Sequence, residues 1–383
     1  MSAIVTTSRL PIIESSIFAR MSRIAAQFNA VNLSQGYPDF PPDERLIEAL
    51  FNAVQSNYNQ YSLSEGIEAL RVAISKMFTV LYSMPVDPVV ELTVTVGATQ
   101  AIFATVSSLV HTGDEVIFFQ PAFECYMPAI MLAGGIPTAL QLHGPTFLPD
   151  WDEVEQAITE RTRMIIINSP HNPTGACWLQ ADARRLGELA DKYGFIVLSD
   201  EVYHNILFEQ QEHVTVFSEP RLRERAVVVG SLSKIMHVTG WRIGYAIASA
   251  ALTAEIRKVH QFQTYAAPTP LQYAIAEILN DSNSYLALSK LFARKRDLFL
   301  DGLQDSRFKW LPTRGGYFQL LDYSAISNEA DSDFANRLIT DFNIAAIPLS
   351  SFSIPYQETR LLRFCFAKKD ETLLTATAIL RTV

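Results

Sequence analysis

Five short apolar runs, spaced by segments with helical periodicity, constrain the fold more than any other feature of this sequence. Continuous apolar runs of this length are typical of strands that are covered on both faces in a parallel sheet. The segment 179–194 is typical of the spacers, with apolar residues at helical spacing and a glycine at its end. The alternation predicts an α/β fold with a large, doubly wound and mostly parallel sheet. The runs are ELTVTV (91–96), EVIFF (115–119), RMIIIN (163–168), FIVLSD (195–200) and AVVVGS (226–231).

The pattern changes at about residue 280. A long helical segment with mixed charge follows, and then two alternating strands, GGYFQLLDY (315–323) and RLLRFCFA (360–367). At the other end of the chain, the proline-rich GYPDFPPDE (36–44) is typical of an extended connection. We therefore expect two domains. Residues 41–279 form the large sheet domain, and residues 1–40 and 280–383 form an N-terminal arm plus a small α+β domain.

The composition excludes several classes of protein. Hydrophobic residues make up 49% and charged residues 19% of the 383 residues, which is ordinary for a globular chain. The formal net charge is −9 and no basic run is interleaved with aromatic residues, so a nucleic-acid surface is not expected. No apolar stretch is long enough to span a membrane, and the first residues do not resemble a secretory leader. We expect a cytoplasmic protein without nucleic-acid or membrane partners.

Metal-ligand spacing is missing from the sequence. The 3 cysteines are far apart and form no CxxC pair, which argues against a disulfide framework and a zinc site. Histidines near the chemistry-bearing segments lack a third donor at ligand spacing, so no metal site is expected. These histidines are His171, His204 and His237.

Polar residues gather just after the predicted strands, where open α/β sheets bind their ligands. Gly97, Ala98 and Thr99 open a helix whose free backbone N–H groups suit a phosphate. A carboxylate that ends a strand, and a lysine near a serine and an arginine, complete a set that suits pyridoxal phosphate. The lysine amine condenses with the cofactor aldehyde, and the carboxylate keeps the ring nitrogen protonated. The later residues of the set are Asn168, Asn172, Asp200, Tyr203, Ser231, Lys234 and Arg242.

Each of these residues also has a plainer interpretation. A lone lysine is usually a solvated surface group. Asp200 alone could cap a helix, and Phe123 could be an ordinary core residue. Arg360 competes with Arg363 as a carboxylate ligand, although the register of the alternating RFCF favours Arg363. Only the combination of residues makes the cofactor interpretation strong.

Four motifs, in order, resemble the fold-type I, class I aminotransferases that use pyridoxal phosphate. The resemblance runs from about residue 30 to 368 and is carried by NQYSLSEGIEALR (59–71), NPTG (172–175), DEVY (200–203) and SLSKIMHVTGWRIG (231–244). It implies that Lys234 holds the cofactor covalently and that Asp200 pairs with the ring nitrogen. Tyr203 and Asn172 would bind the phenolic oxygen, and Phe123 would stack on the ring. The implied phosphate ligands are Gly97, Ala98, Thr99, Ser231 and Arg242, with Tyr61 from a second subunit.

Within this family, the sequence most resembles the methionine, glutamine and kynurenine branch, and there the bacterial-type methionine aminotransferases. The segments VNLSQGYPDFPP (31–42), HNPTG (171–175) and RFCFAKKD (363–370) carry this likeness. Ser233 and Arg242 depart from the usual glycine and lysine but keep the required size and charge. The resemblance implies that Arg363 binds the substrate carboxylate beside Asn172, in a homodimer with shared sites. The remaining substrate contacts that it implies are Gly36, Phe18, Tyr37, Tyr61 and Tyr265, largely an apolar and aromatic wall suited to long side chains.

Alternatives remain open at this point. Besides kynurenine or glutamine transamination, the same cofactor would support β-lyase action on cysteine conjugates, which releases pyruvate without an acceptor. An oxidoreductase is disfavoured because the first strand-to-helix turn lacks GxGxxG spacing. A regulator that binds the cofactor without catalysis would need an additional DNA-binding segment.

Overall fold

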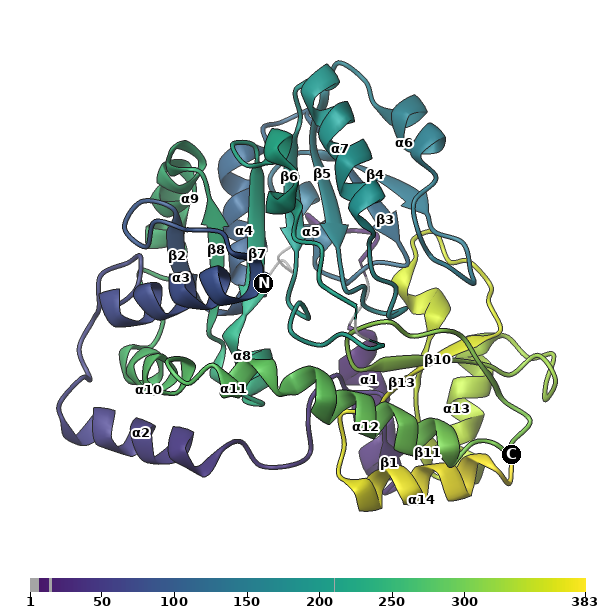
Figure 1. Ribbon diagram of the computed structural model, residues 1–383. Helices are drawn as coiled ribbons and strands as arrows, with labels where there is room; N and C mark the ends of the chain where they lie inside the picture. Colours follow the sequence, from purple (N-terminus) through teal and green to yellow (C-terminus); the bar gives the residue numbers. More distant parts are fainter. Residues whose placement is uncertain (1–6, 14–15, 210) are drawn as a thin grey trace, which may run out of the picture.

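A central sheet of seven strands organises the computed structural model, which describes residues 7–13, 16–209 and 211–383 (Figure 1). Its strand order is β2-β8-β7-β6-β5-β3-β4. Strand β8 is antiparallel to both of its neighbours, and every other pair is parallel. The prediction of a large, mostly parallel sheet is confirmed. The strands are β2 (Leu92–Thr95), β3 (Glu115–Gln120), β4 (Ile136–Gln141), β5 (Thr162–Asn168), β6 (Ile196–Asp200), β7 (Ala226–Ser231) and β8 (Gly244–Ala248).

Two of these strands were not predicted. Edge strand β4 is partly exposed along its length and begins Ile136–Pro137, so it lacks the continuous apolar run of a central strand. Strand β8 is buried, but it is short and begins at Gly244, the last residue of the GWRIG motif (240–244), which was considered only for Arg242.

Successive residues along the strands face two separate hydrophobic cores, which is the reason for their unbroken apolar runs. In β3, for example, Ile117 and Phe119 belong to one core, whereas Val116 and Phe118 belong to the other. Residues of α3 and α7 pack into the first core, and residues of α4, α5 and α9 into the second. The sheet is therefore covered by helices on both faces (Figure 1). The bounds are α3 (Glu68–Tyr82), α4 (Gly97–Leu109), α5 (Tyr126–Leu132), α7 (Gln180–Tyr193) and α9 (Ala250–Gln263).

A smaller antiparallel sheet, of order β12-β13-β10-β9, lies in the C-terminal part of the chain with helices α12, α13 and α14 around it (Figure 1). The segment predicted to be one long helix is divided at Ala287, a turn residue between α11 and α12 whose φ of −76° and ψ of −13° still lie in the αR region. The elements are α11 (Asn283–Leu286), α12 (Leu288–Asp301), β9 (Lys309–Trp310), β10 (Phe318–Asp322), α13 (Asp331–Phe342), β12 (Ile347–Pro348), β13 (Leu361–Cys365) and α14 (Asp370–Leu380).

Helix α1 and strand β1 join this C-terminal part rather than the large sheet. Strand β1 (Val31–Asn32), which follows helix α1 (Ile17–Gln27), pairs in parallel with β11 (Ile344–Ala345). Leu33 continues the contact by accepting a 2.8 Å hydrogen bond from the Cys365 N–H. The exact domain limits at residues 41 and 279 stay a prediction, and residues 1–6, 14 and 15 of the predicted arm lie outside the described residues.

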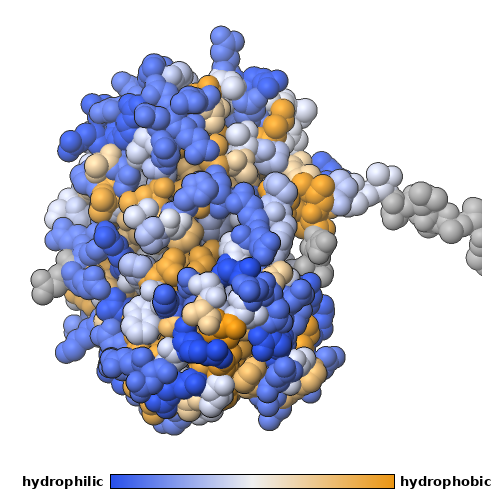
Figure 2. All heavy atoms as spheres, turned by 90° about the vertical axis from the view of Figure 1, so that its right-hand side faces the viewer, coloured by the Kyte–Doolittle hydropathy of each residue, from blue (hydrophilic) through white to orange (hydrophobic). Residues whose placement is uncertain are grey.

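Four further helices complete the α-helical elements of the described chain. Helices α2 and α10 pack against each other to one side of the large sheet, at the left of Figure 1. The face in Figure 2 is mostly hydrophilic, with hydrophobic patches between its upper and lower parts and in its lower part. Within the described residues, no helix has both the length and the apolar character needed to cross a membrane. The helices are α2 (Glu44–Gln55), α6 (Trp151–Ala157), α8 (Leu232–Ile235) and α10 (Thr269–Leu279).

Strand direction brings the predicted functional segments to one edge of the large sheet. In the register of β5 and β6, Asn168 lies beside Asp200, and β7 ends one strand further at Ser231. Antiparallel β8 begins at the same edge, where Gly244 pairs with both Ser231 and Thr95. The loops and helix starts that follow these strands therefore share one end of the sheet.

Candidate active site

A cavity of about 220 Å³ lies at this edge of the large sheet. Its wall combines strand ends of the large sheet with residues of β10, β13, α1 and the segment after β1. Twelve of the residues to which sequence reasoning gave a role in the site line this cavity. They are Phe18, Gly36, Ala98, Thr99, Phe123, Asn172, Asp200, Tyr203, Ser231, Lys234, Arg242 and Arg363.

Lys234 reaches the cavity from the short helix α8, which begins directly after β7. Its side chain keeps some solvent contact through the cavity but is otherwise surrounded by protein. The Nζ atom donates a 2.9 Å hydrogen bond to the Gly36 carbonyl. Burial lowers the pKa of Lys234 to about 8, and the nearby Arg242 and Arg363 cations act in the same direction. The amine can therefore lose its proton close to neutral pH.

Asp200 ends β6 and is only 3% exposed. Its Oδ2 accepts a 2.7 Å hydrogen bond from Tyr126 Oη, and its Oδ1 accepts a 3.3 Å bond from the Val202 N–H. Burial raises the pKa of this carboxyl to about 6, although both hydrogen bonds and the Lys234 charge oppose the rise. On the neighbouring strand, Asn168 Nδ2 donates to the Asp200 carbonyl at 2.8 Å and thereby fixes the backbone.

The start of α4 forms an anion-binding cradle together with Arg242. Gly97 adopts a φ of +73°, and a Cβ placed on it would lie 2.6 Å from Arg242 Nη2. The guanidinium therefore packs directly against the first turn of α4. Ala98 and Thr99 follow on the cavity wall, where the unpaired N–H groups and the positive end of the helix dipole attract negative charge.

Arg363 on β13 is 1% exposed and lies among three aromatic rings, Phe18, Phe318 and Phe352. The nearest of them, Phe318, has its ring centre 4.0 Å from the guanidinium carbon. Arg363 Nη1 donates to Asn172 Oδ1 and Nη2 donates to the Ser34 carbonyl, both at 2.7 Å.

The guanidinium of Arg363 retains hydrogen-bonding capacity. Its Nε has no hydrogen-bond partner within the described residues. Burial lowers the pKa of Arg363 to about 10, which still leaves the group charged at neutral pH. A buried cation with a free donor beside a cavity is suited to bind a carboxylate.

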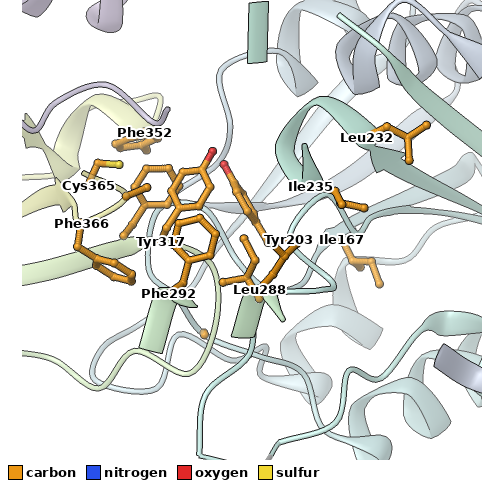
Figure 3. Packing of buried hydrophobic residues seen from close by; sticks show 14 of the residues in the cluster. Ile167, Tyr203, Leu232, Ile235, Leu288, Phe292, Tyr317, Phe352, Cys365 and Phe366 are labelled. Carbon is orange, nitrogen blue, oxygen red and sulfur yellow. The ribbon is translucent and has the colours of Figure 1, made fainter. Parts of the chain in front are cut away.

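An aromatic cluster borders the cavity near Lys234. The ring centres of Tyr203 and Tyr317 are 4.9 Å apart in an edge contact, and Phe292 packs on Tyr317 (Figure 3). Tyr317 Oη donates to the Gly36 carbonyl at 2.9 Å, the same oxygen that Lys234 contacts. Burial raises the pKa of Tyr203, so its hydroxyl keeps its proton at neutral pH.

Comparison with known proteins identifies the family. The family model of class I and II aminotransferases matches residues 29–379. The chain belongs to this family. The aminotransferase is 45% identical over 379 residues to methionine aminotransferase of Escherichia coli (strain K12), which covers 99% of this chain and 98% of that relative. It is 33% identical over 405 residues to kynurenine–oxoglutarate transaminase 3 of Mus musculus, with 97% and 89% covered.

Solved structures agree with the family assignment. The structure of YbdL from Escherichia coli, for which a methionine aminotransferase function is identified, superposes with a TM-score of 0.97 at 44% identity and covers 100% of both chains. N-succinyldiaminopimelate aminotransferase from Mycobacterium tuberculosis superposes with a TM-score of 0.95 at 34% identity, covering 99% of this chain and 100% of that one. The predictions of a fold-type I aminotransferase, and of pyridoxal phosphate as its cofactor, are confirmed.

The chemistry of this aminotransferase cavity fits the cofactor. A phosphate needs hydrogen-bond donors and positive charge, which the start of α4 and Arg242 offer. A protonated ring nitrogen needs a buried carboxylate, and Asp200 is one. The aldehyde needs an amine that can become neutral, and burial gives Lys234 that property. Within the described residues, no three metal-ligating side chains lie together.

Four predicted site residues do not line the cavity of their own chain. Gly97 lies behind Arg242, because the guanidinium occupies the space next to its Cα. Tyr37 lies just beyond the wall, where its carbonyl accepts a 2.8 Å hydrogen bond from Lys368 Nζ. Tyr61 and Tyr265 lie together, with ring centres 5.2 Å apart, and remain 86% and 49% exposed. This exposure leaves both tyrosines accessible to another subunit.

The structure also adds wall residues to which sequence reasoning gave no role. Asn168 was already noted because it ends a predicted strand, but it received no role there. Gln35 and Phe318 had no such signal in the sequence, because each reaches the cavity from a segment distant in the chain. Tyr126 does not line the cavity and was missed because only the folded chain places its hydroxyl on Asp200. The additional wall residues are Gln35, Ile102, Asn168, Val202 and Phe318.

Proposed function

We propose that this aminotransferase takes the amino group from methionine and from other long apolar or aromatic amino acids. The observation that carries this proposal is that each cation in the described cavity wall already has a role, so that none of them remains to pair with a second carboxylate of the substrate. Within the described residues, this wall contains the cations Lys234, Arg242 and Arg363. The first two belong to the cofactor and the third to the α-carboxylate in this proposal. A second carboxylate on the substrate would therefore remain unpaired, at a cost of several kcal/mol.

Aromatic surface near Arg363 supports the same preference. Phe18 and Phe318 line the cavity and pack on the guanidinium, so a substrate bound there meets apolar rings beside its carboxylate. A long thioether side chain gains about 0.8 kcal/mol of binding free energy for each methylene that it buries, and an aromatic ring gains in the same way by burying its apolar surface. The methionine aminotransferase of Escherichia coli, at 45% identity, is a relative with the matching substrate. The kynurenine transaminase of Mus musculus, at 33% identity, favours a second candidate with an aromatic substrate.

Each residue of the predicted site receives a role in this proposal. Lys234 is the covalent attachment point, and Asp200 pairs with the ring nitrogen of the cofactor. Asn172 and Tyr203 bind the phenolic oxygen, and Phe123 stacks on the ring. The phosphate ligands are Gly97, Ala98, Thr99, Ser231 and Arg242, with Tyr61 contributed by a second subunit; Gly36, Tyr37, Phe18 and Tyr265 border the substrate.

The chain's own residues orient the donor and move its proton. Arg363 and Asn172 bind the α-carboxylate, with the free Nε of Arg363 as an additional donor. Lys234 Nζ removes the α-proton as general base and later returns a proton as general acid, for which a pKa of about 8 is well placed. The bound cofactor supplies an aldehyde for the exchange of amines and a ring that accepts the electron pair. Asp200 supports that ring by holding its proton.

A direct experiment compares amino donors. The purified enzyme is mixed with each donor at equal concentration, without an acceptor, and the loss of the cofactor's absorbance is followed. Methionine should exceed alanine by roughly one to two powers of ten in efficiency, because its additional methylenes are buried in the transition state. Aromatic amino acids and glutamine should follow methionine. Aspartate or an acidic diaminopimelate derivative reacting faster than methionine would contradict the proposal.

We further propose a homodimer in which Tyr61 and Tyr265 act across the interface. Their exposure and mutual contact on one chain support this arrangement. Lys234→Ala chains are mixed with Tyr61→Phe chains, which produces heterodimers with one site that has both an intact Lys234 and an intact Tyr61. Activity should exceed that of either parent. A mixture no more active than its parents would contradict shared sites.

We propose the cytoplasm as the compartment. Cys125, Cys177 and Cys365 are buried free thiols, as is usual for proteins in a reducing compartment. Fractionation of the source cells with an antibody against the protein tests this. Recovery in the membrane or the secreted fraction would contradict it.

A further inference from the structure

The hydroxyl of Tyr126 is directed at the carboxylate of Asp200. Tyr126 is the first residue of α5 and is 3% exposed. Its Oη donates to Asp200 Oδ2 at 2.7 Å. Within the described residues, the Asp200 carboxylate accepts no hydrogen bond from any other side chain. This contact joins α5, which lies between β3 and β4 in the chain, to the end of β6.

We propose that Tyr126 is a positioning residue that holds the Asp200 carboxylate in the orientation required by the cofactor ring nitrogen. The inference rests on the role proposed above for Asp200 and extends it to a residue outside the cavity wall. Tyr126 itself touches neither substrate nor cofactor in this proposal. It acts through Asp200 alone.

The geometry around Asp200 explains why a tyrosine is needed. The backbone of this residue is fixed, because its carbonyl accepts from Asn168 Nδ2 at 2.8 Å and from the Ser169 N–H at 3.2 Å. The carboxylate itself is fixed less firmly, since its other hydrogen bond, from the Val202 N–H, is 3.3 Å long. The shorter Tyr126 bond therefore sets the rotation of the carboxylate. It also compensates part of the cost of burying the charge.

Packing alone does not require the hydroxyl. The Tyr126 ring meets Phe123 in an edge contact with centres 6.1 Å apart, which a phenylalanine would also make. A buried tyrosine hydroxyl needs an acceptor, and here that acceptor is Asp200. Replacement by phenylalanine thus removes the proposed function and retains the packing.

The test uses two cofactors that differ at one ring atom. Apoenzyme carrying Tyr126→Phe is titrated with pyridoxal phosphate and with its 1-deaza analogue, in which a C–H replaces the ring nitrogen, and binding is followed by protein fluorescence. We expect affinity for pyridoxal phosphate to fall about tenfold and affinity for the analogue to stay within about twofold. The analogue lacks the atom through which Asp200 acts, so a general loosening of the site would weaken both.

Tyr323→Phe is the matched control. Tyr323 is fully buried, and its Oη donates a 2.9 Å hydrogen bond to the Glu329 carbonyl in the small domain. Its loss should change neither affinity. A second variant, Tyr126→Leu, also lacks the hydroxyl and must reproduce the selectivity of Tyr126→Phe, so that either variant decides the matter if the other folds poorly.

Asp200→Asn separates failure of this inference from failure of the proposed function. If Asp200→Asn weakens both cofactors equally, the role proposed for Asp200 is wrong. If Asp200→Asn selectively weakens pyridoxal phosphate but the Tyr126 variants weaken both cofactors or neither, Asp200 keeps its role and the positioning function of Tyr126 is overturned.

Discussion

Lys234 and Arg363 are two cations in the wall of the same cavity, but their surroundings act on their charges in different ways. Among the described residues, Lys234 Nζ makes one hydrogen bond, of 2.9 Å to a backbone carbonyl, and burial lowers its pKa to about 8. Arg363 lies among three aromatic rings and makes two 2.7 Å hydrogen bonds. Its pKa, about 10, leaves it charged.

The difference reflects two kinds of chemistry. Covalent attachment and proton transfer need an amine that can be neutral, and a poorly solvated lysine meets that need. Binding of a carboxylate needs a charge that persists and a planar group with fixed donors, which arginine provides. The two cations should therefore not be interchangeable, and reciprocal substitutions test this directly.

The largest effect is expected from Lys234→Arg. The variant keeps a positive charge but has no amine that becomes neutral, so turnover with methionine should fall by about four powers of ten or more. Reduction with borohydride followed by peptide mapping should label Lys234 only in the parent. Lys368→Arg is the control, because Lys368 is also buried but contacts the Tyr37 carbonyl. Substantial activity in Lys234→Arg would show that another lysine carries the cofactor.

The reciprocal change, Arg363→Lys, should be less severe. Lysine keeps the charge but loses the paired donors and the stacking on Phe318, so kcat/KM should fall by roughly two to three powers of ten, mainly through KM. Affinity for pyridoxal phosphate should stay unchanged. Arg360→Lys is the control, since Arg360 binds the Ser327 carbonyl. A larger loss from the Arg360 variant would transfer the carboxylate-binding role to Arg360.

Asp200 extends the comparison to the free energy of unfolding, because its burial disfavours the charged form of the side chain, as burial does for Lys234 and Arg363. Burial raises the pKa of the Asp200 carboxyl to about 6 in the folded chain, from its ordinary value of 3.8. Because the folded chain holds this proton more tightly than the unfolded chain does, the protonated carboxyl contributes stability. This contribution is fully present below pH 4 and is lost as the pH rises through 6. The apoenzyme with Asp200→Asn should therefore be more stable than the parent at pH 7, by about 2 to 3 kcal/mol, and equal to it near pH 3.5. Urea unfolding at both values measures this, and a pH-independent difference would refute the assignment.

The smallest effect concerns the anion cradle on the cofactor side. Gly97→Ala places a Cβ 2.6 Å from Arg242 Nη2 and strains a φ of +73°, so affinity for pyridoxal phosphate should fall about tenfold. Gly194→Ala is the matched control, because Gly194 has a φ of +82° and no atom of the described residues lies within 4 Å of an added Cβ. Both variants should lose similar stability, but only Gly97→Ala should lose cofactor affinity, as determined by fluorescence titration. If the two variants bind pyridoxal phosphate with equal affinity, the phosphate does not bind at the start of α4.

The residues near Lys234 were the easier ones to predict from sequence. Asp200, Ser231 and Lys234 each stand at or just after an apolar run, and parallel strands bring such positions to one edge of the sheet. The unpredicted β4 and β8 do not disturb this logic, since β4 is an edge strand and β8 returns antiparallel to the same edge. The apolar runs in the sequence and the common direction of the strands were therefore sufficient to predict that these residues lie close together.

Residues near Arg363 depend on contacts between distant segments. Phe18 and Gly36 reach the cavity because β1 pairs with β11, a contact across more than three hundred residues that has no local signature. The family resemblance suggested both residues, whereas the chain's own periodicity did not. Gln35 and Phe318 were missed for this reason.

The sequence by itself determined the doubly wound sheet, the family and the segments that carry the cofactor chemistry, because strand periodicity and contiguous motifs are local properties of the chain. Only the tertiary structure decided which groups share the cavity, how far burial shifts the pKa of Lys234, Asp200 and Arg363, and that Tyr126 bonds to Asp200. Desolvation and hydrogen-bond geometry depend on every segment packed around a group. No single stretch of sequence contains that information.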